Sequence, residues 1–231
     1  MTLAVAMRVE GAIILAADSR GTIGDPRGLT AISDNHVKIF GIGKCGLALA
    51  GASEMGAALL DELRKKGVDA VADIDAARDQ IVSECAQLFA GWFREIPPEK
   101  RPAVLMILAG YRFPVGKTAE PMIYLLNSQT NFAPQLFNTP CMAGVPQYAV
   151  YLVHRYYAPT IAPDRAKCLA EYLITETASQ DPKVGGPVRM AEITPDNGYG
   201  ELDQNEVDTI HQENESLNEK LRQFYLAGGT E

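Results

Sequence analysis

Cysteine and histidine are scarce in this sequence, and long apolar segments are missing. The four cysteines are scattered and form no CxxC pair, which indicates free thiols in a reducing compartment rather than a disulfide framework. The three histidines, His36, His154 and His211, are too far apart for a metal-ligand spacing. No segment approaches the roughly 18 consecutive apolar residues of a membrane helix, and no signal-peptide pattern is visible. We therefore expect a cytoplasmic protein without a metal site.

Positively charged residues are fewer than negatively charged residues. The chain has 21 Lys and Arg residues against 29 Asp and Glu residues, which gives a net charge of −8 and a pI near 5.0. This balance argues against nucleic acid or an anionic membrane as the main partner. Residues 41–44 have the wrong spacing for a phosphate loop, and residues 51–56 lack the first glycine pair of a dinucleotide fingerprint. We expect no cofactor.

The 231 residues, 47% of them hydrophobic, can bury one large core. Period-2 and apolar segments predict strands at 2–9, 12–18, 36–42, 46–50, 103–112, 120–127, 131–137 and 188–194. Three- and four-residue spacing of apolar residues predicts helices at 53–66, 74–94, 148–157, 163–179 and 204–225. A loop is expected at 21–28, which is rich in Gly, Asp and Pro. This order predicts an α+β fold, a four-layer αββα sandwich of two stacked antiparallel sheets flanked by helices.

The C-terminal segment differs from the rest in being polar with one apolar stripe. We expect residues 1–203 to form the main domain and residues 204–231 to form a helical extension. The stripe consists of Val207, Ile210, Leu217, Leu221 and Phe224. Two interpretations remain open: the stripe packs on its own domain, or it contacts a neighbouring subunit.

The N-terminal residues suggest a reaction. If Met1 is removed, Thr2 carries a hydroxyl and a free α-amine, and that amine can accept the proton of the hydroxyl. A nearby lysine ammonium would favour the neutral amine, and a carboxylate would hold the lysine charged. Lys38 and Asp18 are the candidates for this pair. A backbone N–H at Gly51 or Ala52, where a strand turns into a helix, would stabilise an oxyanion.

Residues 2–54 resemble the proteasome β-subunit family, including its bacterial HslV-type members. That family begins at a threonine and continues with G-x-[IV]-[IL]-A-x-D-x-R, a lysine before an aliphatic strand, and an A-G at the first helix. The matching segments here are 11–20, 38–40 and 50–51. The resemblance implies the N-terminal nucleophile hydrolase fold and a threonine-type peptidase that cleaves peptides or unfolded proteins. It further implies a homo-oligomeric ring and a separate ATP-dependent unfoldase.

A weaker resemblance covers the second half of the chain. Residues 143–149 match the family's G-S-G-x-x-[FY]-A segment, and residues 180–186 match R-D-x-x-S-G-G. The match implies that Asp181 supports the terminus, and that Arg20 helps Asp18 to hold Lys38. Two family serines that bond around the terminal amine are replaced, by Gly144 and Val184. Either water covers this loss, or the enzyme is slow or narrow in specificity.

Four further residues are candidates for the substrate pocket. His36 precedes Lys38 by two residues, which places both on one face of the expected strand, although simple packing explains a histidine there equally well. Gly21, Leu49 and Ser53 are the other three.

Two other functions remain as alternatives to the peptidase. One is a catalytically weak or inactive ring scaffold with the same fold, and the other is an amidohydrolase acting on a small molecule.

Overall fold

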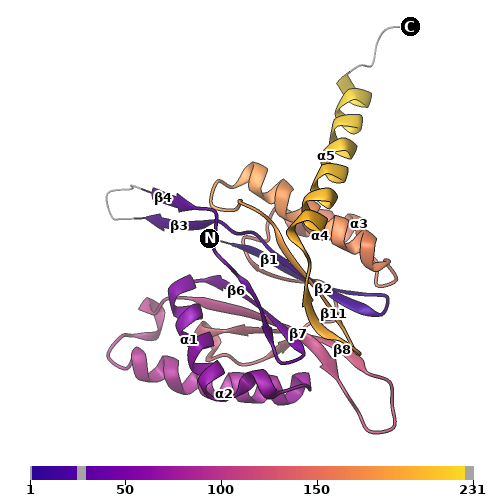
Figure 1. Cartoon of the computed structure of the whole chain (residues 1–231). Helices are drawn as coiled ribbons and strands as arrows, with labels where there is room; N and C mark the ends of the chain where they lie inside the picture. The colour runs from indigo at the N-terminus through magenta and orange to yellow at the C-terminus, as the bar shows by residue number, and fades with distance from the viewer. Residues whose placement is uncertain (1, 25–29, 227–231) are drawn as a thin grey trace, which may run out of the picture.

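Two antiparallel five-stranded sheets are stacked face to face, and helices cover their outer faces (Figure 1). The computed structural model describes residues 2–24 and 30–226. The first sheet has the strand order β10-β1-β2-β11-β12, and the second has the order β5-β6-β7-β8-β9. This is the four-layer α+β sandwich that the sequence predicts.

The strands are short and evenly divided between the sheets. The first sheet contains β1 (Leu3–Val9), β2 (Ala12–Ala17), β10 (Cys141–Gly144), β11 (Arg189–Thr194) and β12 (Gly198–Glu201). The second contains β5 (Ile39–Ile42), β6 (Cys45–Gly51), β7 (Val104–Arg112), β8 (Glu120–Asn127) and β9 (Gln135–Leu136). A separate two-stranded ribbon consists of β3 (Gly21–Gly24) and β4 (Thr30–Ser33).

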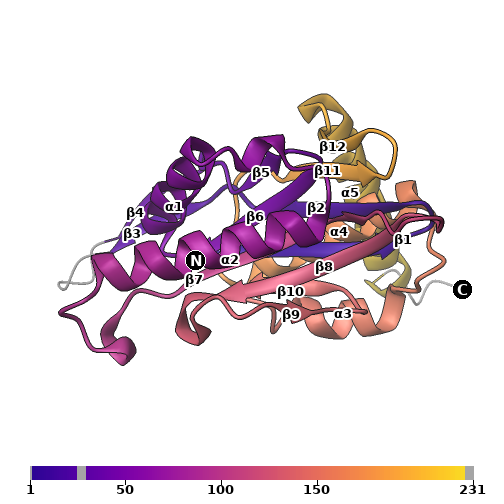
Figure 2. The same ribbon diagram turned by 90° about the horizontal axis from the view of Figure 1, so that it is seen from below.

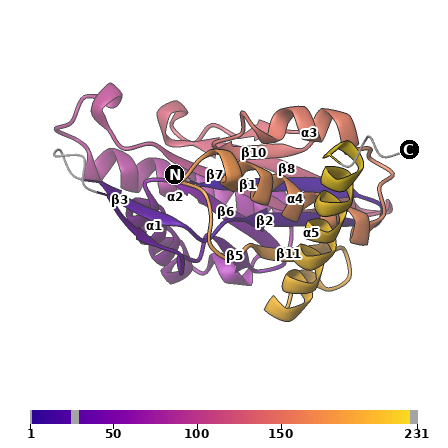
Figure 3. The ribbon, with the colours of Figure 1, turned by 90° about the horizontal axis from the view of Figure 1, so that it is seen from above.

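The helices form the two outer layers. Seen from below, α1 (Ser53–Lys65) and α2 (Ile74–Trp92) lie over the second sheet (Figure 2). Seen from above, α3 (Ala149–Tyr156), α4 (Pro163–Gln180) and the start of α5 (Gln204–Leu226) lie over the first (Figure 3). Three short 3₁₀ helices span Val68–Ala70, Pro98–Lys100 and Ser128–Thr130.

Helix α2 shows how the sequence sets an element's start and its buried face. The Asp73 carboxylate accepts the N–H groups of Asp75 at 2.9 Å and Ala76 at 3.3 Å, and thereby satisfies donors that a helix start leaves unpaired. The buried residues follow the three- and four-residue spacing of one helix face: Ile74, Ala77, Ile81, Cys85 and Phe89.

Strand β1 shows how the core is divided. Alternate residues of a strand point to opposite faces of the sheet. The larger side chains, such as Leu3 and Val5, pack under α3 and α4, whereas Ala4 and Ala6 lie in the layer between the two sheets. Both faces of β1 are therefore buried, and the same holds for every residue of β2.

The β1–β2 hairpin positions the N-terminal residues. Ala4 pairs with Ala17, so Thr2 precedes and Asp18 follows the paired segment at the same end of the sheet. The next two residues are still joined, because the Asp18 N–H donates to the Leu3 carbonyl at 3.2 Å. The register of one hairpin thus brings Thr2 and Asp18 together.

Several predicted elements differ from the structure. The loop expected at 21–28 is part of the β3–β4 ribbon as far as it is described, and residues 25–29 lie outside the described residues. The strand expected at 131–137 is reduced to β9, because the chain first makes a 3₁₀ turn and places Phe132 at a φ of 58°. That side chain is fully buried, and its ring packs edge-on against Phe89 at 5.5 Å. Burial of an aromatic ring offsets the cost of this backbone conformation.

Helix α5 leaves the body of the molecule along its length. Its first turns are docked through the buried residues Val207 and Ile210. Its second half projects outward (Figure 1), and Leu217, Leu221 and Phe224 are exposed there. Packing on the chain's own domain therefore accounts for the first half of the stripe only. Among the described helices, none has the length and apolar character needed to cross a membrane.

Candidate active site at the start of β1

Besides Ser19, three polar residues are buried where β1 begins and β2 ends. Thr2 is 5% exposed, Asp18 is 1% exposed and Lys38 is 4% exposed. Buried charges are rare unless they are paired and hydrogen-bonded. The cluster therefore requires partners for each charge.

The Asp18 carboxylate is the centre of this cluster. Its Oδ1 atom accepts the Leu3 N–H at 3.1 Å and the Lys38 ammonium at 2.8 Å. Its Oδ2 atom accepts the N–H groups of Arg20 at 3.2 Å and Gly185 at 3.1 Å. Four donors match the roughly four lone-pair positions of a carboxylate, so the orientation of Asp18 is fixed. Because Leu3 directly follows Thr2, the Lys38 ammonium and the backbone at Thr2 meet at one oxygen atom.

Lys38 is held by two oxygen atoms at the end of a buried stem. Its Nζ atom donates to Asp18 and, at 2.7 Å, to the Arg20 carbonyl. Burial lowers the pKa of Lys38, and the Asp18 carboxylate opposes that shift. The Lys38 carbonyl accepts the Leu49 N–H at 2.8 Å, which ties the residue to β6 although β5 begins only at Ile39.

Arg20 contacts both Asp18 and Lys38 through its backbone, with its N–H on Asp18 and its carbonyl on Lys38. Its guanidinium turns to Asp34, with Nε to Oδ1 at 2.7 Å and Nη2 to Oδ2 at 2.9 Å. This contact raises the pKa of Arg20 and lowers that of Asp34. Sequence reasoning missed Asp34, and its only signal was its place in the polar segment just before Lys38.

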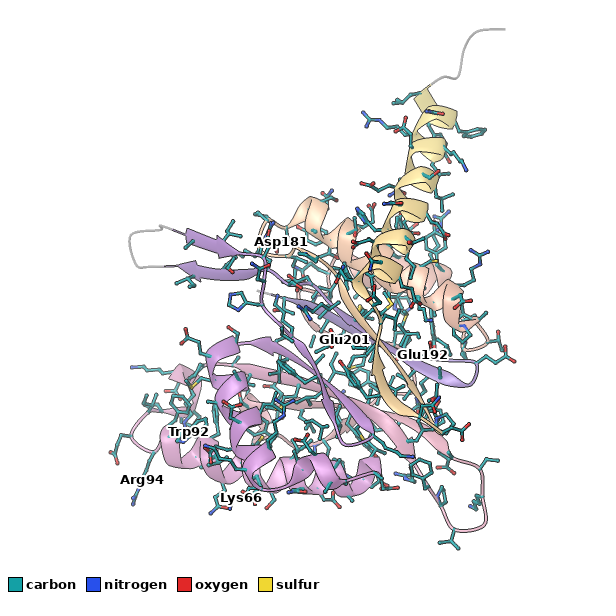
Figure 4. All side chains as sticks on the ribbon, in the orientation of Figure 1. Lys66, Trp92, Arg94, Asp181, Glu192 and Glu201 are labelled. Carbon is teal, nitrogen blue, oxygen red and sulfur yellow. The ribbon has the colours of Figure 1, made fainter. Side chains whose placement is uncertain are left out.

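Asp181 shapes a turn. Its carboxylate accepts the Lys183 N–H at 2.9 Å, and its carbonyl accepts the Val184 N–H at 3.0 Å. Within the described residues, no hydrogen bond joins this carboxylate to Thr2. Figure 4 labels Asp181 close to the base of the β3–β4 ribbon. The turn delivers Gly185, whose carbonyl accepts the Ser19 N–H at 3.0 Å and whose N–H reaches Asp18. Asp181 thus supports Asp18 indirectly.

The backbone at Gly144 leaves no room for the serine of the pattern that residues 143–149 resemble. Gly144 has a φ of 100°, and a Cβ atom there would lie 1.7 Å from the Thr2 carbonyl oxygen. That oxygen accepts the Val145 N–H at 2.9 Å, which fixes the approach of the two segments. A serine therefore does not fit at position 144. Val184 is fully buried in the apolar cluster beneath α4.

Of the two expected oxyanion donors, one is already used. The Ala52 N–H donates to the Ala103 carbonyl at 2.8 Å. Because the N–H groups of an antiparallel strand alternate in direction, the Gly51 N–H points to the other edge of β6. The Leu49 N–H, two residues away, points to that same edge and reaches Lys38. Only Gly51 therefore remains a candidate donor on the side of Lys38.

The four pocket candidates fall into different environments. The His36 ring lies against Gly21, where a Cβ atom would be 2.1 Å from the ring, so a side chain at position 21 would displace the ring. Leu49 is buried in the core under α1, next to Gly56. Ser53 is exposed at the first position of α1. The structure brings Gly21 and His36 together next to Arg20 and leaves Leu49 with little surface for a ligand.

No cluster of three His, Cys, Asp or Glu side chains suited to a metal ion occurs in the part of the chain that the structure describes.

The matches between this chain and known proteins are matches of three-dimensional structure. No family model and no curated protein sequence matches the chain. Among solved structures, a Gly-1 mutant of Anbu from Hyphomicrobium sp. strain MC1 aligns over 100% of this chain and 99% of that one, with 16% identity and a TM-score of 0.74. Anbu (ancestral beta-subunit) from Yersinia bercovieri aligns over 99% and 98%, with 17% identity and a TM-score of 0.74. A structure titled as the helical assembly of the Anbu complex from Pseudomonas aeruginosa aligns over 96% of both chains, with 17% identity and a TM-score of 0.73.

These relatives correct the family expected from the sequence. The expected assignment to the proteasome β-subunit and HslV-type family is wrong, because the similar structures are Anbu proteins, which are proteasome-like but distinct. At 16–17% identity the likeness establishes the fold alone. The chain has a proteasome-like α+β fold, as the sequence predicts.

Proposed function

We propose that this protein is an N-terminal threonine hydrolase that cleaves amide bonds once Thr2 has become the first residue. The observation that carries the proposal is the shared oxygen of Asp18, which joins the buried Lys38 ammonium to the amide that follows Thr2. An ordinary strand start needs no buried ammonium, and a buried ion pair is costly unless its geometry is well satisfied.

The first chemical step is acylation of Thr2. A free α-amine has a pKa of about 7.7–8.0, and the nearby positive charge of Lys38 favours its neutral form. The neutral amine takes the proton of the Thr2 hydroxyl as Oγ1 attacks the substrate carbonyl. The negative charge that develops on the carbonyl oxygen is stabilised by the Gly51 N–H.

The second step releases both products. The protonated amine gives its proton to the leaving nitrogen as the C–N bond breaks, and an ester remains on Thr2. Water attacks that ester by the same proton route, so the acid leaves and Oγ1 regains its proton. Asp18 and Lys38 keep their positions throughout.

A peptide is the substrate that the surroundings favour. The β3–β4 ribbon begins at Gly21, directly after Arg20, and contains only two strands, so each has an unpaired edge within the described residues. Extended peptides bind such edges through main-chain hydrogen bonds. An ATP-dependent unfoldase stays a prediction from the sequence.

Self-association is the second part of the proposal. The solved structure of the Anbu complex from Pseudomonas aeruginosa is a helical assembly. This chain has the same fold, and the outer half of α5 exposes apolar side chains. We therefore expect a homo-oligomer, which light scattering of the purified protein measures directly.

The experiment combines intact-mass spectrometry with an active-site probe. We expect the purified chain to lack Met1 and to gain the mass of one β-lactone molecule. Thr2→Ala should gain none, and Lys38→Met should react at least about 100-fold more slowly, because the positioned charge is lost. A chain that retains Met1, or that reacts equally well as Thr2→Ala, contradicts the proposal.

A non-catalytic scaffold is the second candidate, and a specific observation favours it. No hydroxyl can stand at position 144, and position 184 is an apolar core residue, so two hydrogen-bonding groups near the terminus are absent. A Met1-free wild-type chain that folds and assembles but forms no adduct supports the scaffold.

A further inference from the structure

Asp34 connects three parts of the candidate site. Its carboxylate binds both Nε and Nη2 of Arg20, the two-point geometry that gives an arginine a fixed direction. With that direction fixed, Arg20 Nη1 donates to the carbonyls of Pro182 at 3.1 Å and Val184 at 3.4 Å. The backbone from 182 to 184 is therefore anchored to Arg20.

The same loop is packed against Asp34 from the other side. Gly186 has a φ of 71°, and a Cβ atom there would lie 2.8 Å from Asp34 Cβ. A Cβ atom on Gly185 would lie 2.6 Å from Arg20 Cζ. Two consecutive glycines thus allow the loop to close on the Asp34–Arg20 pair. Between these contacts lies the Gly185 N–H, which donates to Asp18.

We propose that Asp34 is a positioning residue for the reaction of Thr2: it fixes Arg20, which anchors residues 182–186 and keeps the Gly185 N–H on Asp18. The expected effect of Asp34 on the reaction rate rests on the proposed hydrolase function, whereas its expected effect on the loop does not.

Charge provides a second route from Asp34 to Lys38. Among the described residues, Asp18 and Asp34 raise the pKa of Lys38, and Arg20 lowers it. Removing the Asp34 charge leaves Asp18 to oppose Arg20 alone and lowers the pKa of Lys38 further. The reaction needs a charged Lys38, so its rate should fall at a lower pH in the variant than in the wild type.

The site tolerates the substitution that tests this idea. The Asp34 side chain is 39% exposed, and it also lines a cavity of ≈ 640 Å³ beside Ser19. An amide has the same size as the carboxylate and is also solvated at this partly exposed position, so Asp34→Asn should fold. Asp79→Asn is a matched control, because Asp79 pairs with Arg78 at 2.7 Å on α2, in the opposite helix layer.

The first measurement is the rate of β-lactone labelling between pH 6 and pH 10. At the optimal pH, we expect labelling of Asp34→Asn to be about tenfold slower than labelling of the wild type. The fall in labelling rate at alkaline pH should begin at a lower pH in this variant. Asp34→Glu should restore the pH of that fall, and Asp79→Asn should match the wild type. If the substitution only loosens the fold, labelling would be slower at every pH and the alkaline fall in rate would stay at the wild-type pH. That result would overturn the proposed effect of the Asp34 charge on Lys38.

The second measurement does not depend on catalysis. Hydrogen exchange of the segment 181–188, followed by mass spectrometry, should be faster in Asp34→Asn than in the wild type and unchanged in Asp79→Asn. Unchanged exchange overturns the inference even if the wild type is an active hydrolase. Faster exchange in a protein that forms no adduct supports the positioning of the loop and rejects the proposed function alone.

Discussion

Among the described residues, the carboxylates of Asp18 and Glu171 are almost completely buried, and they are held in different ways. Asp18 is bound by three backbone N–H groups and one ammonium. Glu171, on α4, is bound by side chains only: Thr175 Oγ1 at 2.6 Å, His211 Nδ1 at 2.6 Å, and the Asn214 amide. Backbone donors cannot titrate or be lost by substitution. The fold itself therefore fixes Asp18, whereas the placement of Glu171 depends on the docking of α5.

The two carboxylates differ in what surrounds them: Asp18 lies in the site proposed for chemistry, and Glu171 joins two helices. Around Asp18, chain segments from both halves of the sequence converge, and one of the donors is a lysine with a lowered pKa. Around Glu171, two helices meet, and the histidine between them has a raised pKa because it bonds to the carboxylate. Perturbed groups that face a reacting terminus suggest catalysis, and perturbed groups that join two helices suggest stability.

The largest effect is expected from Asp18→Asn. The Lys38 ammonium would stay buried without its carboxylate, which costs about 3–5 kcal/mol in the free energy of unfolding. Labelling of Thr2 should stop. The double variant Asp18→Asn/Lys38→Met removes both charges, so urea unfolding should show much of the stability regained while labelling stays absent. Equal stability of the single variant and the wild type contradicts the ion-pair account.

Gly144→Ser tests the rigidity of the same region. A side chain at a φ of 100°, pressed against the Thr2 carbonyl, should destabilise the protein by about 1–3 kcal/mol and displace the start of β1. The added hydroxyl should therefore lower labelling rather than raise it. Faster labelling would mean that the backbone adapts and that the missing serine limits the rate. Gly116→Ser, at a turn with open space, controls for the loss of a glycine.

Glu171→Gln tests the second region. The amide keeps the shape but weakens the bond to His211, so we expect a loss of about 1–2 kcal/mol and faster proteolysis within α5. Labelling of Thr2 should be unchanged. Glu176→Gln is a suitable control, because Glu176 lies further along α4 and, among the described residues, its carboxylate accepts a single hydrogen bond, from the Asn218 amide at 3.2 Å. Equal proteolysis of the two variants removes the special role of Glu171.

The smallest effect is a pH dependence at His211. Glu171 on α4 faces the imidazole, as do Glu215 and Asp208 on α5, and the bond to Glu171 raises its pKa. A raised folded-state pKa contributes stability that is complete below the unfolded value of about 6.5 and is lost as pH rises through the folded value. Because the His211 side chain is 42% exposed, solvent screening reduces its contribution to the free energy of unfolding to about 0.5 kcal/mol. Thermal unfolding measured from pH 5.5 to 9 should show this loss of stability in the wild type and not in His211→Gln.

The sequence predicts the Asp18–Lys38 contact but not its surroundings. Both residues belong to one ordered motif near the start of the chain, and the β1–β2 hairpin makes Asp18 a local neighbour of Thr2. Gly185 belongs to the weaker match at 180–186, but nothing in that pattern indicates a contact with Asp18, 167 residues away. Asp34 belongs to neither match and is an aspartate in an ordinary polar turn. Contacts of this kind follow from the folded loop, which residue spacing does not encode.

The same limit applies to the fold. Long apolar or strictly periodic segments, such as β2, β7 and α4, are predicted nearly to their ends. The edge strands β9, β10 and β12 have two to four residues and are set by the partner strand beside them rather than by their own composition. The Gly- and Asp-rich segment after Arg20 carries the composition of a loop, and pairing of Thr22 with Ile32 makes it a ribbon.

The most direct test maps the β-lactone adduct by tandem mass spectrometry in the wild type and in Lys38→Met. The expected result is one ester, on the hydroxyl of a Thr2 that bears a free amine, and almost none in the variant under conditions where circular dichroism shows that the variant is folded. An adduct on any other residue, or equal labelling of Thr2 without the ammonium, would contradict the claim that the buried pair activates this hydroxyl.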